Sequence, residues 1–103
     1  MKNKVYGLLG LCSKAGKVIV GTDVCVENIK NKKVKLIILA NDTSEKSKEK
    51  IKFLCVENEV EVIEYGDIEQ LSRSVGKINK AVIGIKDKNF AIEIKKLVDG
   101  GEI

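Results

Sequence analysis

A glycine-rich stretch near the N-terminus, "GLCSKAGKVIVGTD" from Gly10 to Asp23, has residue types that could bind phosphate. A P-loop needs four residues between its first glycine and its Gly-Lys pair, followed by Ser or Thr, so that backbone N–H groups, the lysine and the hydroxyl each reach their ligands. Here five residues separate Gly10 from Gly16, and Val18 follows Lys17. The following "VIV" is β-branched and predicts a strand instead of the helix that a P-loop requires. The spacing therefore excludes a nucleotide-hydrolysing loop.

Other residues with catalytic or metal-binding chemistry are scarce. The chain has no histidine, and its three cysteines, Cys12, Cys25 and Cys55, are far apart in the sequence. Without histidine the usual base that activates a cysteine or serine is missing, and no ligand cluster for a metal is formed. We expect buried, reduced thiols in a cytoplasmic protein, no metal, no cofactor and no catalytic residues.

Composition sets the scale of the protein. The 103 residues are enough for one domain, which we assign to residues 1–103. Apolar residues make up 44% of the chain and charged residues 33%, as in soluble globular proteins. No apolar run approaches the ~20 residues of a membrane span, and the N-terminal segment predicts an amphipathic helix instead of a signal peptide. The net charge of +4 permits a polyanionic partner without requiring one.

Hydrophobic periodicity predicts regular alternation of helices and strands. Apolar runs predict strands at residues 16–21, 34–40, 60–65 and 80–85, and the run at 34–40 is continuous enough for a central strand. Helical spacing predicts helices at 2–14, 22–32 and 67–74, with two more that begin near residues 42 and 87. We therefore expect an α/β fold, a three-layer α/β/α sandwich on a mixed four-stranded sheet.

Polar residues at the expected helix starts indicate how these helices are capped. Thr22 and Asp87 are at N-cap positions, Asp42 with Glu45 resembles a capping box, and Asp67 is followed by Gln70 three residues later.

The start of the helix near Thr22 is a candidate phosphate site. Unpaired N–H groups and the positive end of the helix dipole attract anions there. Gly21 would let a ligand backbone come close, and Asp23 could accept hydrogen bonds from a base edge. The alternative is that Gly21 is a simple turn and Asp23 an exposed helix-start acid.

The stretch "GKVIVGTDVCVENIKNKKVKLIILANDTS" closely resembles the core of the kink-turn RNA-binding ribosomal protein superfamily, the L-seven-A-e group, which includes small bacterial YlxQ-like members. A second segment, "LSRSVGK", resembles the family signature L-G-x-x-x-G. The resemblance covers approximately residues 4–98 and agrees with the predicted order of elements. It implies a non-enzymatic protein that docks onto a sharply bent internal loop of RNA.

The resemblance also implies which residues contact RNA. In the family, a glycine and a following N-E-x-x-K at the start of the second helix read sheared G·A pairs, and these positions fall on Gly21, Asp23, Val24 and Glu27, next to Thr22. The chain thus has Asp, Val and Glu where the family has Asn, Glu and Lys. The implied remaining contacts are Asp42 and Ser44 after the central strand, and the loop "GKINK", with Ile78 as an apolar platform and Lys77, Asn79 and Lys80 around it.

Lys14 and Lys17 could extend a basic rim around this site, or be solvated lysines. The expected partner is structured RNA of the kink-turn type, ribosomal RNA included, bound by a cytoplasmic monomer as part of a ribonucleoprotein, with no membrane and no DNA. The altered N-E-x-x-K positions keep a second class open, a protein-interaction module on the same fold. An enzyme is disfavoured by the missing histidine and the dispersed thiols, although fold alone does not exclude one.

Overall fold

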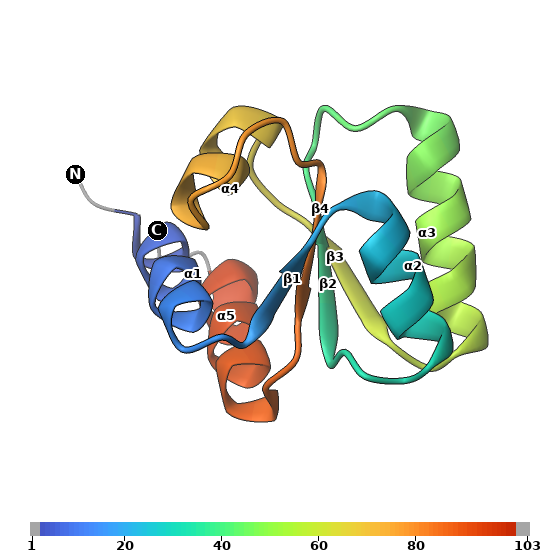
Figure 1. Cartoon of the computed structure of the whole chain (residues 1–103), viewed down its shortest axis with the longest axis horizontal. Helices are drawn as coiled ribbons and strands as arrows, with labels where there is room; N and C mark the ends of the chain where they lie inside the picture. Colours follow the sequence, from blue (N-terminus) through green and yellow to red (C-terminus); the bar gives the residue numbers. More distant parts are fainter. Residues whose placement is uncertain (1–2, 101–103) are drawn as a thin grey trace.

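Helices and strands alternate along the chain in the predicted order in the computed structural model, which describes residues 3–100 (Figure 1). The helices are α1 (Lys4–Lys14), α2 (Thr22–Lys30), α3 (Glu45–Glu57), α4 (Ile68–Ser74) and α5 (Lys88–Gly100). The strands are β1 (Val18–Val20), β2 (Leu36–Leu39), β3 (Glu61–Glu64) and β4 (Val82–Ile85). Each strand is shorter than its predicted segment, because the flanking residues leave the hydrogen-bonded ladder.

The four strands form one mixed sheet in the order β1-β4-β2-β3. β2 pairs in parallel with β3, whereas β4 runs antiparallel to both β1 and β2. The fully buried strands β2 and β4 are the two central ones, which confirms the central position predicted from the apolar run at 34–40.

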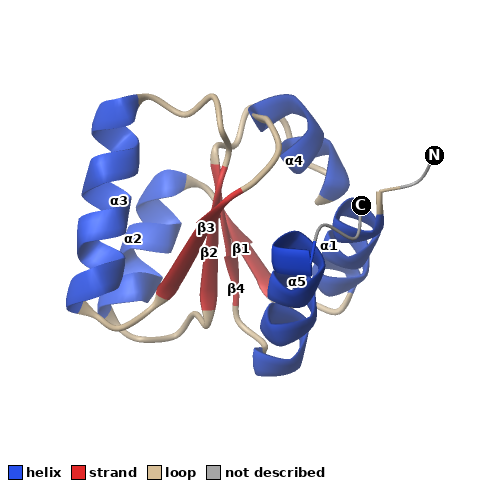
Figure 2. Ribbon diagram, turned by 180° about the vertical axis from the view of Figure 1, so that it is seen from behind, coloured by secondary structure: helices blue, strands red, loops and turns tan. Residues whose placement is uncertain are grey.

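Helices cover both faces of the sheet (Figure 2). Residues of α1, α4 and α5 pack with Leu36, Ile38 and Ile85 in one buried cluster. Residues of α2 and α3 pack with Ile37 and Leu39 in a second cluster on the opposite face. Alternate residues of β2 thus face opposite layers, as strand geometry requires, and the predicted three-layer α/β/α fold is confirmed.

Two predicted helix caps are confirmed. The side chain of Asp67 accepts a hydrogen bond of 2.7 Å from the Gln70 N–H, and that of Asp87 accepts one of 2.9 Å from the Phe90 N–H. Each carboxylate satisfies an N–H group that has no partner within its helix.

The other two predicted caps were wrong. Thr22 is the first residue inside α2, and the N-cap is Gly21, which has no side chain to accept a hydrogen bond. At α3 the cap is Ser44 instead of Asp42, with the Ser47 N–H donating to the Ser44 hydroxyl over 3.2 Å. The connection after β2 continues for several residues beyond the strand, which brings Ser44 to the helix start.

All three cysteines are free thiols with no exposed surface, as predicted. Burial raises the pKa of the Cys25 thiol to about 12 and those of Cys12 and Cys55 to about 11. Within residues 3–100, no group of three or more His, Cys, Asp or Glu side chains is arranged to hold a metal ion. None of the described helices has the length and apolar character to cross a membrane.

The connections between elements gather at two opposite ends of the sheet, at the top and bottom of Figure 1. We call the first the α2 end, formed by residue 21 and the connections 40–44, 65–67 and 75–81. We call the second the lysine end, formed by the connections 15–17, 31–35, 58–60 and 86–87. Helices α2, α3 and α4 all begin at the α2 end.

Candidate nucleic-acid interface at the α2 end

Gly21 holds the start of α2 in a conformation that favours glycine. Its φ of 110° and ψ of 150° lie in a region that side chains rarely adopt. The Gly21 N–H donates to the Val82 carbonyl over 2.9 Å, which fixes the turn against β4. A Cβ atom at this position would meet no other atom within 4 Å, so the space beside the turn is open.

The first turn of α2 is exposed and uncapped. No side chain accepts a hydrogen bond from its N–H groups, so those of the first turn have no partner inside the helix. Thr22, Asp23 and Val24 are all exposed, and Val24 leaves 46% of its surface in solvent. Glu27 is also exposed and lies one turn further along the helix, next to Asp23 on the same face. The turn therefore offers N–H donors to an anion, beside two acidic side chains.

The connection 75–81 approaches α2 from the neighbouring strand, because Val20 of β1 pairs with Ile83 of β4. Within this connection, Gly76 and Asn79 have positive φ values of 72° and 57° and form tight turns. Ile78 lies at the tip of the connection and is 86% exposed, more than any other large apolar side chain of the described residues. The loop thus presents an apolar surface to solvent.

Ser72 fixes the shape of this connection. Ser72 stands where the family signature L-G-x-x-x-G has its first glycine, and it is only 1% exposed. Its hydroxyl accepts a 2.7 Å hydrogen bond from the Lys80 N–H and donates a 3.0 Å bond to the Lys80 carbonyl, while its carbonyl accepts from the Lys77 N–H over 2.8 Å. Sequence analysis assigned no role to this serine, because nothing local in the sequence shows that a side chain in α4 would bind a loop eight residues later.

A cavity of about 760 Å³ lies between α4 and this loop. Its lining includes Ser72, Arg73, Gly76, Lys77 and Ile78, and Asp42 borders it from the end of β2. Arg73 is held at its edge by a 2.8 Å ion pair with Glu69. The cavity has apolar, cationic and hydrogen-bonding groups in one place.

The connection 40–44 is the third segment at this end, and its Ala40 N–H donates to the Ala81 carbonyl over 3.0 Å. Asp42 does not cap its own helix but accepts a 2.9 Å hydrogen bond from the Ile68 N–H at the start of α4. Ser44 is exposed and caps α3. Asp42 therefore ties the end of β2 to α4 and helps to shape the cavity.

Lys48 is a residue that sequence analysis missed. Its ammonium group donates a 2.7 Å hydrogen bond to the Asn41 carbonyl and lies 3.1 Å from a Glu64 carboxylate oxygen, with only 8% of the residue exposed. The hydrogen bond with Glu64 raises the pKa of Lys48, while Lys52 and then Lys48 lower the pKa of Glu64. Lys48 thus crosslinks the connection 40–44 to α3 and β3. A lysine among many in an exposed-looking helix gives no sequence signal for this role.

Lys14 and Lys17 are not brought to the α2 end. Lys17 precedes β1 and Gly21 follows it, so about 13 Å of strand separate their Cα atoms. Lys14 ends α1, three residues before Lys17. The remaining predicted positions do meet at the α2 end, with Glu27 one turn down α2, because the strands that carry their connections are neighbours in the sheet.

The sequence profile of the ribosomal protein L7Ae/L30e/S12e/Gadd45 family matches residues 3–95. The chain belongs to this family. It is 36% identical over 99 residues to the RNA-binding protein YlxQ of Enterococcus faecium, covering 96% of this chain and 95% of that protein. It is 32% identical over 94 residues to the RNA-binding protein YlxQ of Bacillus subtilis, covering 91% of this chain and 94% of that protein.

Solved structures of similar proteins agree with the family assignment. A protein of unknown function from Bacillus halodurans superposes with a TM-score of 0.92 at 32% identity, covering 95% of this chain and 99% of that one. The 15.5kD RNA binding protein of Giardia lamblia superposes with a TM-score of 0.78 at 16% identity, covering 97% of this chain and 92% of that one. The second likeness shows the L7Ae-type fold at low sequence identity.

Proposed function

We propose that this member of the L7Ae family is a non-enzymatic RNA-binding protein that docks the α2 end onto sharply bent, kink-turn-like RNA. The observation that carries the proposal is the juxtaposition of the uncapped α2 N-terminus at Gly21 with the exposed Ile78 loop and its cavity. The two YlxQ relatives are named as RNA-binding proteins, which supports the same conclusion. The protein acts as a cytoplasmic monomer within a ribonucleoprotein.

Each part of the α2 end has a defined role in this proposal. The N–H groups of the first turn bind a backbone phosphate at the bend, and Gly21 keeps the approach free of a side chain. Thr22, Asp23 and Val24 face the widened groove, with Glu27 behind them, and Asp23 accepts hydrogen bonds from base edges. Ile78 supports one unstacked base over the cavity.

The surrounding groups position the RNA backbone. Lys77 and Lys80 lie on either side of Ile78 and Asn79 in the loop, where their charges attract phosphates. Asp42 and Ser44 act from the end of β2 by holding α4 and the start of α3. Recognition is therefore mainly of RNA shape, since the base-reading residues of the family are replaced at three positions.

The test is binding to a kink-turn RNA compared with a straight duplex of equal length. We expect tight binding to the bent RNA, weakened by Gly21→Glu and by the double change Lys77→Glu and Lys80→Glu. The double change should also reduce the steepness of log K against log salt concentration by about 2. The double change Lys4→Glu and Lys50→Glu, on exposed positions of α1 and α3, is the matched control and should leave the preference for bent RNA intact.

The second candidate is a protein-interaction module, favoured by the exposed Val24 and Ile78 and by the acids at the α2 start. Weak binding of equal strength to the bent and the straight RNA would reject the kink-turn proposal and leave this candidate. Loss of RNA preference in the matched control as strong as in the Lys77/Lys80 variant would reject the assignment of the site.

A further inference from the structure

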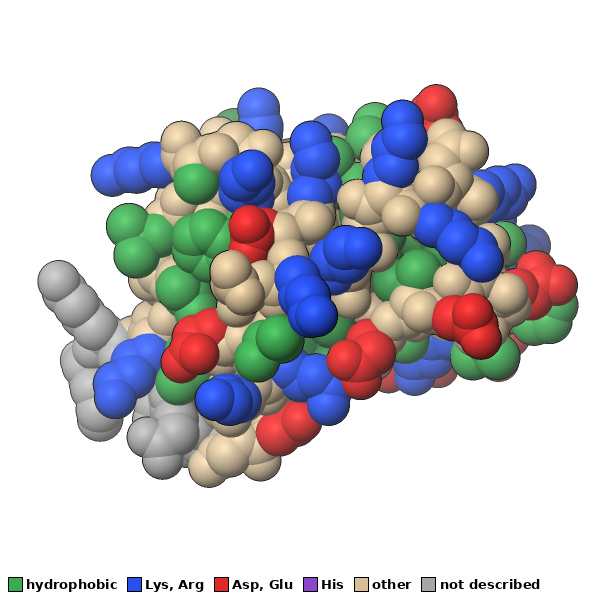
Figure 3. All heavy atoms as spheres, turned by 90° about the horizontal axis from the view of Figure 1, so that it is seen from below, with side chains coloured by type: hydrophobic (Ala, Val, Ile, Leu, Met, Phe, Trp, Pro, Cys, Tyr) green, Lys and Arg blue, Asp and Glu red, His purple; other side chains and the backbone are tan. Residues whose placement is uncertain are grey.

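The lysine end carries more positive charge than the proposed RNA site. Its four connections contain five lysines against two acidic residues, Glu59 and Asp87. The connections of the α2 end contain two lysines, Lys77 and Lys80, against two acidic residues, Asp42 and Asp67. Figure 3 looks onto the lysine end and shows lysine side chains spread across its middle, with acidic side chains between and around them.

Three of these lysines form a row across the sheet. The Lys86 N–H donates to the Lys17 carbonyl over 2.8 Å, and the Lys35 N–H donates to the Ile85 carbonyl over 2.7 Å. The strand register places Lys86 between Lys17 and Lys35, on three neighbouring strands. Adjacent strands are about 4.8 Å apart, so three ammonium-bearing residues are anchored within about 10 Å. We call Lys17, Lys86 and Lys35 the lysine row.

The lysine row has no ion-pair partner among the residues that the structure describes. All three residues are exposed, and no carboxylate of residues 3–100 lies within 4.0 Å of their ammonium groups. Like charges at this spacing repel each other in the free protein. A bound polyanion would remove that repulsion and release its own condensed counterions.

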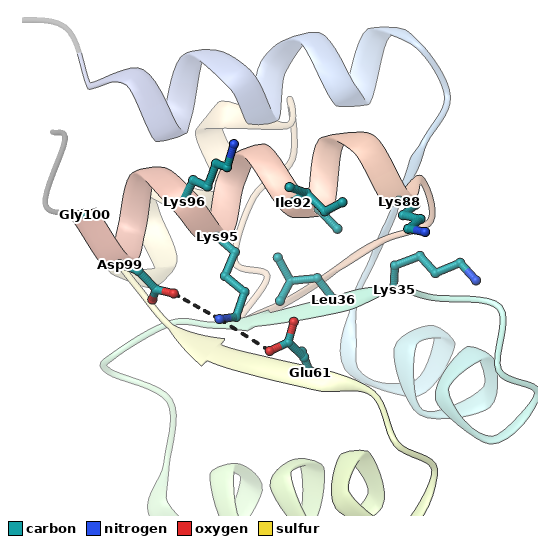
Figure 4. Close-up of a pocket in the computed structure, with 10 residues that line it drawn as sticks. Lys35, Leu36, Glu61, Lys88, Ile92, Lys95, Lys96, Asp99 and Gly100 are labelled. Atoms are coloured by element: carbon teal, nitrogen blue, oxygen red, sulfur yellow. Dashed lines mark hydrogen bonds and ion pairs between the residues drawn. The ribbon is translucent and has the colours of Figure 1, made fainter.

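The neighbouring groove shows how different a neutralised lysine is. A groove of about 760 Å³ runs along α5 beside the starts of β2 and β3. Figure 4 shows Lys95 in this groove between Asp99 and Glu61, at 3.0 and 3.4 Å, whereas Lys35 and Lys88 lie at the other end, away from both acids. Among the lysines that line the groove, Lys95 is therefore the one held between two acids, whereas Lys35 of the lysine row and Lys88 beside it have no carboxylate of residues 3–100 within 4.0 Å.

We propose that the lysine row, with Lys88 beside it, binds the phosphate backbone of a second RNA segment, so that the protein holds two RNA segments at opposite ends of its sheet. This inference rests on the proposed RNA-binding function. The two surfaces face opposite directions in Figure 1, so a segment that lies on one does not cover the other.

The chemistry of the row favours RNA over a protein partner. Lysine is depleted in the cores of protein interfaces, which are enriched in aromatic residues, and the four connections of the lysine end contain no aromatic residue. Lys32 and Lys33 follow the C-terminus of α2, where lysine complements the helix dipole. Lys17 likewise follows the C-terminus of α1, where its N–H donates to the Cys12 carbonyl. Lys35 and Lys86 flank strands, and the helix dipole does not explain them.

The experiment is formation of a ternary complex by the full chain. The protein is first saturated with unlabelled kink-turn RNA, and a labelled straight RNA duplex is then titrated in at several salt concentrations. We expect the second RNA to bind, with a slope of log K against log salt of about −2 to −3 for three phosphates. The triple variant Lys17→Gln, Lys35→Gln and Lys86→Gln should weaken this second binding by about ten- to a hundredfold at low salt and keep its affinity for kink-turn RNA.

The matched control is Lys4→Gln, Lys46→Gln and Lys50→Gln, which removes the same charge from exposed positions of α1 and α3. Equal weakening by the two triple variants would reduce the effect to net charge and overturn the proposal. Competition of the duplex with the kink-turn RNA, instead of joint binding, would also overturn it. Unchanged duplex binding in the lysine-row variant would leave the row to a partner other than RNA and overturn it as well.

The duplex titration is also done without kink-turn RNA, so that the two proposals can fail separately. Failure of the wild-type chain to prefer bent RNA overturns the function proposed for the α2 end. A loss of duplex binding confined to the lysine-row variant would still support the second surface in that case.

Discussion

The two ends of the sheet offer a polyanion different kinds of binding. At the α2 end three helices begin, so N–H groups and positive dipole ends point outward, while lysines and acids in the connections are balanced. At the lysine end α1, α2 and α3 finish, while α5 begins there with its first turn capped by Asp87. The positive charge at this end comes from lysine side chains beside strands and in loops. The first end suits recognition of one shape at short range, and the second suits attraction to phosphate without sequence preference.

This difference shows that the net charge of +4 says little about where RNA binds. The charge is concentrated away from the residues that resemble the family's RNA-contacting positions. Binding at the α2 end should therefore depend less on salt than binding at the lysine end.

Substitution of the two glycines that flank β1 should have very different effects on the stability of the fold. Gly21 at the α2 end has φ 110° and ψ 150°, which only glycine adopts readily, whereas Gly16 at the lysine end has φ 72°, in the left-handed region that Asn tolerates. Gly21→Asn should lower the free energy of unfolding by about 1–3 kcal/mol and weaken binding to bent RNA. Gly16→Asn should change the free energy of unfolding by less than about 0.5 kcal/mol. Urea unfolding measures both, and equal losses would show that the α2 turn is not specially constrained.

The next effect concerns the acids at the start of α2. Asp23→Asn with Glu27→Lys should raise the affinity for bent RNA about tenfold. Asn keeps the hydrogen-bond acceptor that Asp23 offers to base edges, the repulsion between two carboxylates and phosphate is removed, and a lysine that attracts phosphate is gained. The control Glu49→Gln with Glu93→Lys makes the same change in net charge at exposed positions of α3 and α5 that have no ion-pair partner within the described part of the chain. Affinity measured at two salt concentrations decides the case, and an equal gain in both variants would contradict a local role for these acids.

A smaller effect compares the two glutamates of β3. Glu64 at the α2 end contacts both Lys48 and Lys52, and these contacts lower its pKa. A lowered pKa adds stability above the unfolded value of about 4.3, and this stability is lost as the pH falls through the folded value. Glu64→Gln should therefore be less stable than wild type at neutral pH, and the difference in stability between the two proteins should disappear as the pH falls. Glu61→Gln at the lysine end should differ little in stability from wild type at any pH, because the Glu61 side chain is 62% exposed and Lys95 is its one ion-pair partner among residues 3–100. Thermal unfolding from pH 3 to 7 tests this.

The buried cysteine thiols should not react with thiol reagents while the protein is folded. Burial raises the pKa of Cys25 to about 12, so the folded protein should not react with a thiol reagent at pH 8, where a free thiol with a pKa near 8.5 is about one quarter ionised. Cys25 packs beneath the α2 end, with its thiol 3.8 Å from the Ile19 and Val82 carbonyls, while Cys12 belongs to the cluster on the other face. Mass spectrometry after labelling would identify local opening of the α2 end if Cys25 reacted before Cys12.

Features that depend on short stretches of chain were predictable from the sequence. The order of helices and strands, the central position of β2, the caps at Asp67 and Asp87 and the buried cysteines follow from periodicity and from contacts three residues apart. The capping prediction failed at Asp42, whose carboxylate binds the Ile68 N–H, 26 residues away in sequence. Local spacing carries no information about such a partner.

The layers of the fold follow from the sequence alone, because the alternation of apolar residues decides which side of each element is buried. The sequence also pointed to Gly21 and the loop 76–80 through family resemblance. Three contacts appear only in the folded chain: Ser72 fixes that loop, Lys48 crosslinks three segments, and Lys17 lies with Lys86 and Lys35 instead of with Gly21. Strand order explains the position of Lys17, because β4 lies between β1 and β2 and this non-local pairing decides which connections become neighbours.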